Sequence, residues 1–201
     1  MDVIMDHLNN YDGIRTEIVG DTVIISALNS ERTMFVEITI PISEVLHIQL
    51  SDLPRGEPFE INLPDANEFR EAEFVIDGKT FSKVLRDANS YGCKRFFIGV
   101  FGKLRPDFEG IYFIAHSDTN KDPEVYETFK LGEYVFDLYI DPEADYVNSV
   151  YDVKYISAIA DIIDLADTVR VIFGNDTPVK ISTEINGYKF TWMIAPLVIG
   201  Y

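Results

Sequence analysis

The sequence predicts an α+β fold of antiparallel sheets with few helices, and three observations lead to this prediction. The C-terminal stretch from Asp167 to Pro196 alternates apolar and polar residues with the two-residue period of β-strands. Within it, Asn186-Gly187 is a pair that favours a type I′ hairpin turn, because both central positions of that turn need a positive φ. Residues 79–91 instead repeat apolar side chains at the spacing of an amphipathic helix.

The first 70 residues contain a short helical pattern, a set of strands and a linker. The helical pattern occupies residues 2–10, and Asp12-Gly13 then turns the chain. Residues 51–70 contain three prolines and Gly56 without a helical period, which predicts a linker. Between these segments, strand-like runs lie at residues 14–19, 22–28, 33–40 and 45–50.

A second and larger unit follows the linker. A strand at residues 72–75 leads into the helix at 79–91, whose apolar face contains Phe81, Val84 and Leu85. The remaining predicted elements are four strands at residues 95–101, 110–117, 126–130 and 134–140, a helix near 152–165, and the three strands of the C-terminal stretch.

Composition and charge narrow the class of protein. The chain has 201 residues, of which 47% are hydrophobic, enough for a sizeable core. Its single cysteine, Cys93, excludes an intramolecular disulfide framework and fits a reducing, intracellular compartment. The N-terminus lacks a basic region typical of a secretory signal, and no apolar run approaches the ~18 residues that span a membrane. The net charge of −17 repels nucleic acid on average, so any DNA contact needs a local basic patch.

The C-terminal stretch also resembles a known family. A strand, then Gly174-Asn-Asp-Thr-Pro178, an alternating hairpin and a closing Ala195-Pro196 are similar to the end of DNA sliding clamps of the proliferating cell nuclear antigen (PCNA) family. The helical pattern that begins at Tyr151 fits the same place in that family, and the resemblance extends over residues 73–199. It implies a sliding-clamp fold, with a truncated clamp-like domain at residues 1–50, an interdomain connector at 51–70 and one complete clamp domain at 71–201.

In function, the resemblance implies a non-enzymatic accessory protein of DNA replication or repair, a processivity factor without a cofactor. Its partners would be DNA polymerase and other replication proteins that carry clamp-binding peptides, and it would work where DNA is replicated, in the cytoplasm or nucleus. Clamps bind such peptides in an apolar pocket between the connector and the C-terminal sheet. A simpler interpretation is that the matching residues are core and turn positions. The matching residues are Ile61, Leu63, Pro64, Pro178, Ala195, Pro196 and Leu197.

A basic helix face is the candidate for DNA contact. The side chains of Lys79, Lys83 and Arg86 share a face, and Lys94 and Arg95 follow the helix. In clamps, such residues contact phosphates of double-stranded DNA without reading its sequence. The alternative is an ordinary solvated face. The other two candidate helices are acidic or neutral on their polar faces, which argues against encirclement of DNA.

The resemblance also implies how subunits would join. Clamp subunits pair the last strand of one first domain with an edge strand of the next subunit. The expected edge strand contains Ile111, Tyr112, Phe113, Ile114, Ala115 and His116. The donating strand lies in the part of the first domain that is missing, and residues 60–63 are a short substitute. We therefore expect a monomer or a weak homo-oligomer.

No catalytic or metal-binding pattern stands out. His7, His47 and His116 are far apart in the sequence, and ordinary surface or hydrogen-bonded histidines explain them best. The acidic residues 141–152 lack the glycine that a calcium loop needs at its sixth position, where Tyr146 stands. Two alternatives to a processivity factor remain. One is a clamp-like decoy or regulator that binds partner peptides or a true clamp subunit without encircling DNA; the other is an enzyme with an unrecognised acidic site.

Overall fold

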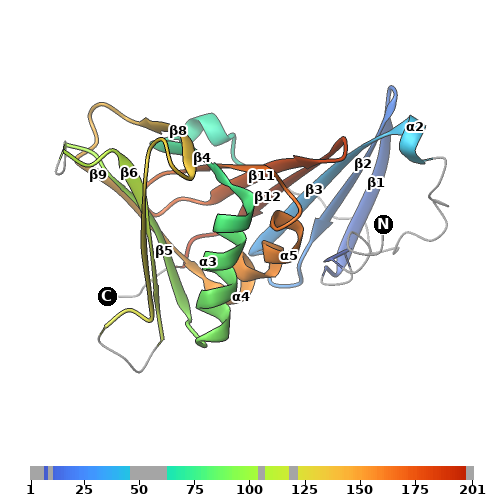
Figure 1. The fold of residues 1–201 in the computed structure, drawn as a ribbon. Coiled ribbons are helices and arrows are strands. Elements are labelled where there is room, and N and C mark those ends of the chain that lie inside the picture. The colour runs from blue at the N-terminus through green and yellow to red at the C-terminus, as the bar shows by residue number, and fades with distance from the viewer. Residues whose placement is uncertain (1–6, 9–10, 46–62, 104–106, 118–121, 198–201) are drawn as a thin grey trace.

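Two antiparallel sheets form the framework of this computed structural model, which describes residues 7–8, 11–45, 63–103, 107–117 and 122–197 (Figure 1). The larger sheet has the strand order β1-β2-β3-β12-β11-β10-β4-β8, and the smaller has the order β7-β6-β5-β9. The larger sheet consists of β1 (Gly13–Val19), β2 (Thr22–Leu28), β3 (Met34–Pro41), β12 (Tyr188–Ile194), β11 (Val179–Ile185), β10 (Thr168–Phe173), β4 (Ala72–Asp77) and β8 (Val135–Ile140). The smaller consists of β7 (Val125–Lys130), β6 (Gly110–His116), β5 (Arg95–Phe101) and β9 (Tyr146–Asp152).

The two ends of the chain share the larger sheet. Strand β3 pairs with β12 in antiparallel register from Met34 opposite Ile194 to Thr39 opposite Lys189. The N-terminal strands therefore extend the sheet of the C-terminal unit, as Figure 1 shows. The domain boundaries at residues 50 and 70 remain predictions.

The predicted C-terminal hairpin is confirmed. Strands β11 and β12 pair along their full length, from Val179 opposite Ile194 to Ile185 opposite Tyr188. Asn186 and Gly187 form the turn with φ values of 51° and 81°, the positive angles that a type I′ turn requires.

Helix α3 (Gly78–Ser90) matches the predicted amphipathic helix. It begins where the Asp77 carboxylate accepts a hydrogen bond from the Thr80 amide at 2.7 Å, which satisfies an amide that the first turn leaves free. A β-carbon at Gly78 would lie 2.1 Å from the carbonyl oxygen of Ala166, which precedes β10. The start of the helix approaches this backbone too closely for a residue with a β-carbon. Further along the helix, the Ser82 hydroxyl donates to the Ala160 carbonyl at 2.8 Å.

The main core contains buried residues of both sheets and of helix α3. Phe113 on β6 is central: its ring centroid lies 5.3 Å from Phe81, 5.7 Å from Phe96 and 6.1 Å from Phe74. A smaller apolar cluster lies apart from this core. It consists of Leu28, Phe35, Ala66, Phe69, Ile172 and Met193, with Leu63 packed against it.

The structure differs from the prediction in two elements. Five strands, not four, separate the two helical regions, because β9 was missed. Its Tyr151 is a buried strand residue, whereas the sequence pattern predicts the start of a helix at that position. The helix near 152–165 is instead three short consecutive segments, α4 (Val153–Ile156), η3 (Ser157–Ile159) and α5 (Ala160–Ile163).

Two predicted elements fall largely outside the described residues. Of the helical pattern at 2–10, residues 7 and 8 are described and helical. Of the strand at 45–50, only residue 45 is described, and it ends α2 (Ile42–Val45). None of the described helices has the length and apolar character that crossing a membrane requires.

Candidate functional site: a pocket on the larger sheet

A pocket of about 310 Å³ lies where the ends of β2, β3 and β12 meet the segment that precedes β4. Its walls come from distant parts of the chain: the β2–β3 turn, the described part of the predicted connector before β4, the β10–β11 turn and the C-terminal end. The lining residues are Leu28, Arg32, Thr33, Met34, Phe35, Leu63, Pro64, Pro178, Met193 and Ala195.

The floor of the pocket follows from strand alternation. Leu28 lies opposite Phe35, and Phe35 lies opposite Met193, so these side chains form a row across three strands. Successive side chains on a strand point to opposite faces. The neighbours Val36 and Trp192 belong to the main core, and the row therefore lies on the face of the sheet that points away from α3.

A tightly bonded turn forms one wall. The Asn29 side-chain oxygen accepts from the amides of Thr33 and Met34, both at 2.9 Å, and the Arg32 amide donates to the Asn29 carbonyl at 2.9 Å. Arg32 has a φ of 55°, a left-handed conformation that residues other than glycine rarely adopt. The Ala195 amide donates to the Thr33 carbonyl at 2.8 Å and places the C-terminal end beside this turn.

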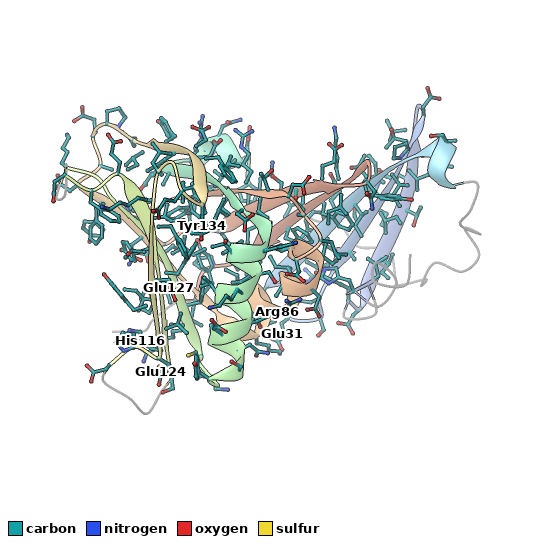
Figure 2. The ribbon with its side chains drawn as sticks, viewed as in Figure 1. Glu31, Arg86, His116, Glu124, Glu127 and Tyr134 are labelled. Carbon is teal, nitrogen blue, oxygen red and sulfur yellow. The ribbon has the colours of Figure 1, made fainter. Side chains whose placement is uncertain are left out.

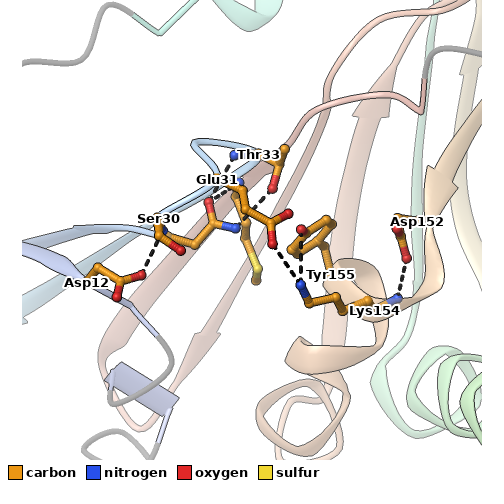
Figure 3. A network of polar contacts seen from close by, with 9 residues as sticks. Asp12, Ser30, Glu31, Thr33, Asp152, Lys154 and Tyr155 are labelled. Atoms are coloured by element: carbon orange, nitrogen blue, oxygen red, sulfur yellow. Dashed lines mark hydrogen bonds and ion pairs between the residues drawn. The ribbon is translucent and has the colours of Figure 1, made fainter.

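Figure 3 shows how the same turn is held from its other side. The Ser30 amide donates to the Asp12 carboxylate at 2.7 Å. The ammonium group of Lys154 on α4 donates to the Glu31 carboxylate at 3.0 Å, and to the Tyr155 hydroxyl at 3.3 Å. Polar contacts on the helical side thus fix a turn whose opposite side faces the pocket.

The connector and the β10–β11 turn complete the pocket. Residues Leu63 and Pro64 precede η2 (Ala66–Glu68), which begins where the Asp65 carboxylate accepts from the Asn67 amide at 3.0 Å. Gly174 starts the β10–β11 turn so close to the connector that a β-carbon would lie 2.5 Å from the Phe69 carbonyl oxygen. This close approach positions Pro178 at the pocket.

The structure brings together four of the predicted pocket residues: Leu63, Pro64, Pro178 and Ala195. Pro196 and Leu197 are described but do not line the pocket, and the Leu197 amide instead donates to the Val150 carbonyl of β9 at 2.7 Å. Ile61 lies outside the described residues. Sequence reasoning missed the row Leu28, Phe35 and Met193. Strand alternation was the available signal, because it directs Phe35 and Met193 to the other face of the sheet from their core neighbours Val36 and Trp192. The peptide-binding role of these residues stays a prediction.

The predicted DNA-contact residues do not form one free basic surface. Lys83 donates to Asp87 at 2.8 Å, and this hydrogen bond raises the pKa of the Lys83 ammonium. Arg86 lies on α3 (Figure 2). Its guanidinium forms ion pairs with Asp161 at 2.8 Å and with Asp164 at 3.3 Å. The hydrogen bond to Asp161 raises the pKa of the Arg86 guanidinium. Acidic partners therefore accompany two of the cations.

The remaining predicted DNA contacts differ in position. Lys79 and Lys94 are exposed. Arg95 is half-buried and precedes Phe96, whose ring lies in the main core. Strand alternation therefore directs Arg95 to the face of the smaller sheet opposite α3. The set of five cations does not share one face.

The predicted subunit edge was wrong. Residues Ile111–His116 belong to β6, which is an inner strand: β5 pairs with one side of it and β7 with the other. The chain returns after β6 as β7, from Ala115 opposite Val125 to Gly110 opposite Lys130, and occupies the backbone groups that were expected to be open. Strand β7, not β6, is an edge of the smaller sheet. The residues predicted to form an open subunit edge were Ile111, Tyr112, Phe113, Ile114, Ala115 and His116.

His7 is a buried histidine whose ring lies between Tyr11 and Trp192. The Trp192 indole donates to its Nε2 at 3.0 Å, and the Tyr11 hydroxyl lies 3.1 Å from the same nitrogen. Burial lowers the pKa of His7 from 6.5 to about 4, so the ring is neutral at pH 7. His7 thus joins the N-terminal segment to β12. Within the described ranges, no group of three histidine, cysteine or acidic side chains is placed to hold a metal ion.

Comparisons with known proteins identify the fold. No protein-family model matches the sequence, and no curated protein matches it. A crystal structure of PCNA from Thermococcus kodakaraensis is similar, with a TM-score of 0.73, 16% identity and coverage of 96% of this chain and 94% of that chain. The PCNA2–PCNA3 complex from Sulfolobus tokodaii gives a TM-score of 0.72 at 18% identity, with the same coverage. PCNA from Entamoeba histolytica gives 0.69 at 12%, covering 97% of this chain and 94% of that chain. The chain therefore has the sliding-clamp fold, as the sequence predicted.

Proposed function

We propose that this chain is a non-enzymatic, sliding-clamp-like accessory protein of DNA replication or repair. It docks polymerases and other replication enzymes inside the cell by binding a short peptide of each in the pocket described above. The observation that carries the proposal is the pocket itself. It lies on the face of the larger sheet away from the helices, and the connector, the β10–β11 turn and the C-terminal end line it together.

The pocket suits an apolar anchor of a partner peptide. Its floor of Leu28, Phe35 and Met193 belongs to the smaller apolar cluster and not to the main core, so filling it does not disturb the fold. The volume of about 310 Å³ falls at the small end of the range for ligand pockets, about 300–1,000 Å³. One or two large apolar side chains of a peptide would fill this pocket. Such buried anchor residues supply most of the binding energy at many interfaces.

A peptide-binding experiment tests this proposal. A labelled peptide of the clamp-binding type, with one glutamine and two aromatic residues, is titrated with the full chain and followed by fluorescence anisotropy. Leu63→Ala weakens binding by about 1–3 kcal/mol, as truncation of an anchor contact does. The control Leu131→Ala truncates a leucine of similar character in the turn between β7 and β8, away from the pocket, and leaves affinity unchanged. Equal affinities of wild type and Leu63→Ala remove this pocket from the proposal.

A second candidate function is a regulator that binds partner peptides, or a true clamp subunit, without encircling DNA. The acidic partners of Lys83 and Arg86 favour it, because they weaken the attraction of α3 for phosphates. The two candidates differ in a polymerase assay on long primed templates. A processivity factor lengthens the products, whereas a regulator leaves them unchanged or shortens them when a true clamp is present.

A further inference from the structure

The charge of the pocket points to one more property of its ligand. Arg32 is the one charged residue among the described residues that line it, and the others are apolar apart from Thr33. The whole chain carries a net charge of −17. The pocket lining is therefore locally positive, although the protein as a whole is strongly acidic.

Arg32 lacks the acidic partner that Arg15, Arg70, Arg86 and Arg170 have among the described arginines. Exposed pairs such as Lys83–Asp87, Lys103–Glu143 and Lys154–Glu31 show the usual arrangement. Within the described part of the chain, Arg32 forms no ion pair, although Glu31 precedes it directly. Glu31 instead binds Lys154 on the helical side of the turn, and Asp12 accepts from the Ser30 amide there. These two carboxylates thus have partners other than Arg32.

The turn fixes the place of Arg32 as well as its isolation. The three hydrogen bonds of the Asn29 side chain, to the amides of Thr33 and Met34 and to the Thr33 hydroxyl, define the chain path around it. The backbone of Arg32 keeps a left-handed φ of 55°, which glycine or asparagine would adopt with less strain. A residue kept in an unfavourable conformation beside a pocket is a reason to look for a role of its side chain.

We propose that Arg32 selects partner peptides with a carboxylate next to the apolar anchor. The anchor fills the floor formed by Leu28, Phe35 and Met193, while an aspartate or glutamate of the peptide accepts hydrogen bonds from the Arg32 guanidinium, whose planar donors suit a carboxylate. Because the pair lies at the exposed rim, it contributes discrimination between peptides more than total affinity. This inference rests on the proposed peptide-binding function.

The test is a glutamate scan of the peptide. The 12-residue probe carries the glutamine and two aromatic residues of the clamp-binding type, with both ends blocked, and each other position is occupied in turn by glutamate or by the uncharged glutamine. On the wild-type chain, glutamate at one or more positions near an anchor binds about threefold to fivefold tighter than glutamine. This preference shrinks at high salt, since exposed pairs are screened.

Two variants attribute the preference to Arg32. Arg32→Gln removes the charge and abolishes the preference, and Arg32→Asn does the same with a residue that suits the left-handed backbone, which guards against a folding defect. The control Arg15→Gln removes an exposed arginine of β1 that pairs with Glu17 and does not line the pocket, and it keeps the preference. A preference that persists in both Arg32 variants, or equal binding of glutamate and glutamine peptides at every position, overturns this inference and leaves the peptide-binding function standing. Absence of binding by every peptide overturns the proposed function and the inference with it.

Discussion

Protonation of His7 should weaken the folded state in a specific pH range. The folded protein holds His7 neutral between Trp192 and Tyr11, with a pKa of about 4, while the unfolded chain has the ordinary value of 6.5. Because the folded pKa lies below the unfolded one, the unfolded state binds the proton first as the pH falls. The contribution of neutral His7 is therefore complete above pH 6.5, decreases as the pH falls through the interval to 4, and changes no further below it.

The size of the effect follows from these two values. The fall of the His7 pKa from 6.5 to about 4 corresponds to about 3 kcal/mol of unfolding free energy once His7 is protonated in both the unfolded and the folded state. At pH 5, where the unfolded state is almost fully protonated and the folded state is not, the loss relative to pH 8 is about 2 kcal/mol.

Urea unfolding at pH 8, 6 and 5 measures this loss. The fluorescence of Trp192, the single tryptophan, reports on unfolding beside His7 itself. Carboxylates also titrate toward pH 5, so the useful quantity is the difference between wild type and His7→Gln, a variant that cannot titrate at this position. We expect the wild type to lose about 2 kcal/mol more than the variant between pH 8 and 5. An equal loss in both proteins would refute the assignment of a buried neutral His7.

Three further predictions concern the turn, the helix and the basic face. Asn29→Ala removes the acceptor of the Thr33 and Met34 amides and lowers the free energy of unfolding by about 1–2 kcal/mol in urea titrations; an unchanged midpoint would show that water replaces both bonds. Gly78→Ala places a β-carbon 2.1 Å from the Ala166 carbonyl oxygen and costs about 1–3 kcal/mol in the same assay, whereas Asn89→Ala on the exposed side of α3 stays within about 0.5 kcal/mol. If α3 contacts phosphates, Lys83→Glu combined with Arg86→Glu abolishes polymerase stimulation and leaves peptide binding intact; stimulation that survives assigns these residues to solvated surface.

Local signals explain which elements the sequence predicts well. The turn at Asn186-Gly187 needs only neighbouring residues, and it occurs as predicted. Strand β9 has a weaker local signal, because its last residues overlap the helical pattern that begins at Tyr151. The inner position of β6 depends on which strand pairs beside it, and such pairing is set by tertiary structure.

The pocket shows the same division. Resemblance to clamps indicated Leu63, Pro64, Pro178 and Ala195, which all lie at turns or in the connector. Phe35 and Met193 are neighbours because β3 pairs with β12, and that pairing between opposite ends of the chain has no local sequence signal. The isolation of Arg32 depends on Lys154 drawing Glu31 to the other side of the turn, and no local pattern contains that contact.

The pairing of β3 with β12 has a consequence for how the chain folds. During synthesis, β1, β2 and β3 leave the ribosome long before the strand that must lie beside β3. Contacts between such distant segments slow folding, since a large loop must close before they form. Until then the backbone groups along β3 present an open edge next to apolar side chains, a surface prone to aggregation. A nascent chain arrested before Tyr188 would keep that edge exposed, so chaperone binding to arrested chains should end once β12 has emerged.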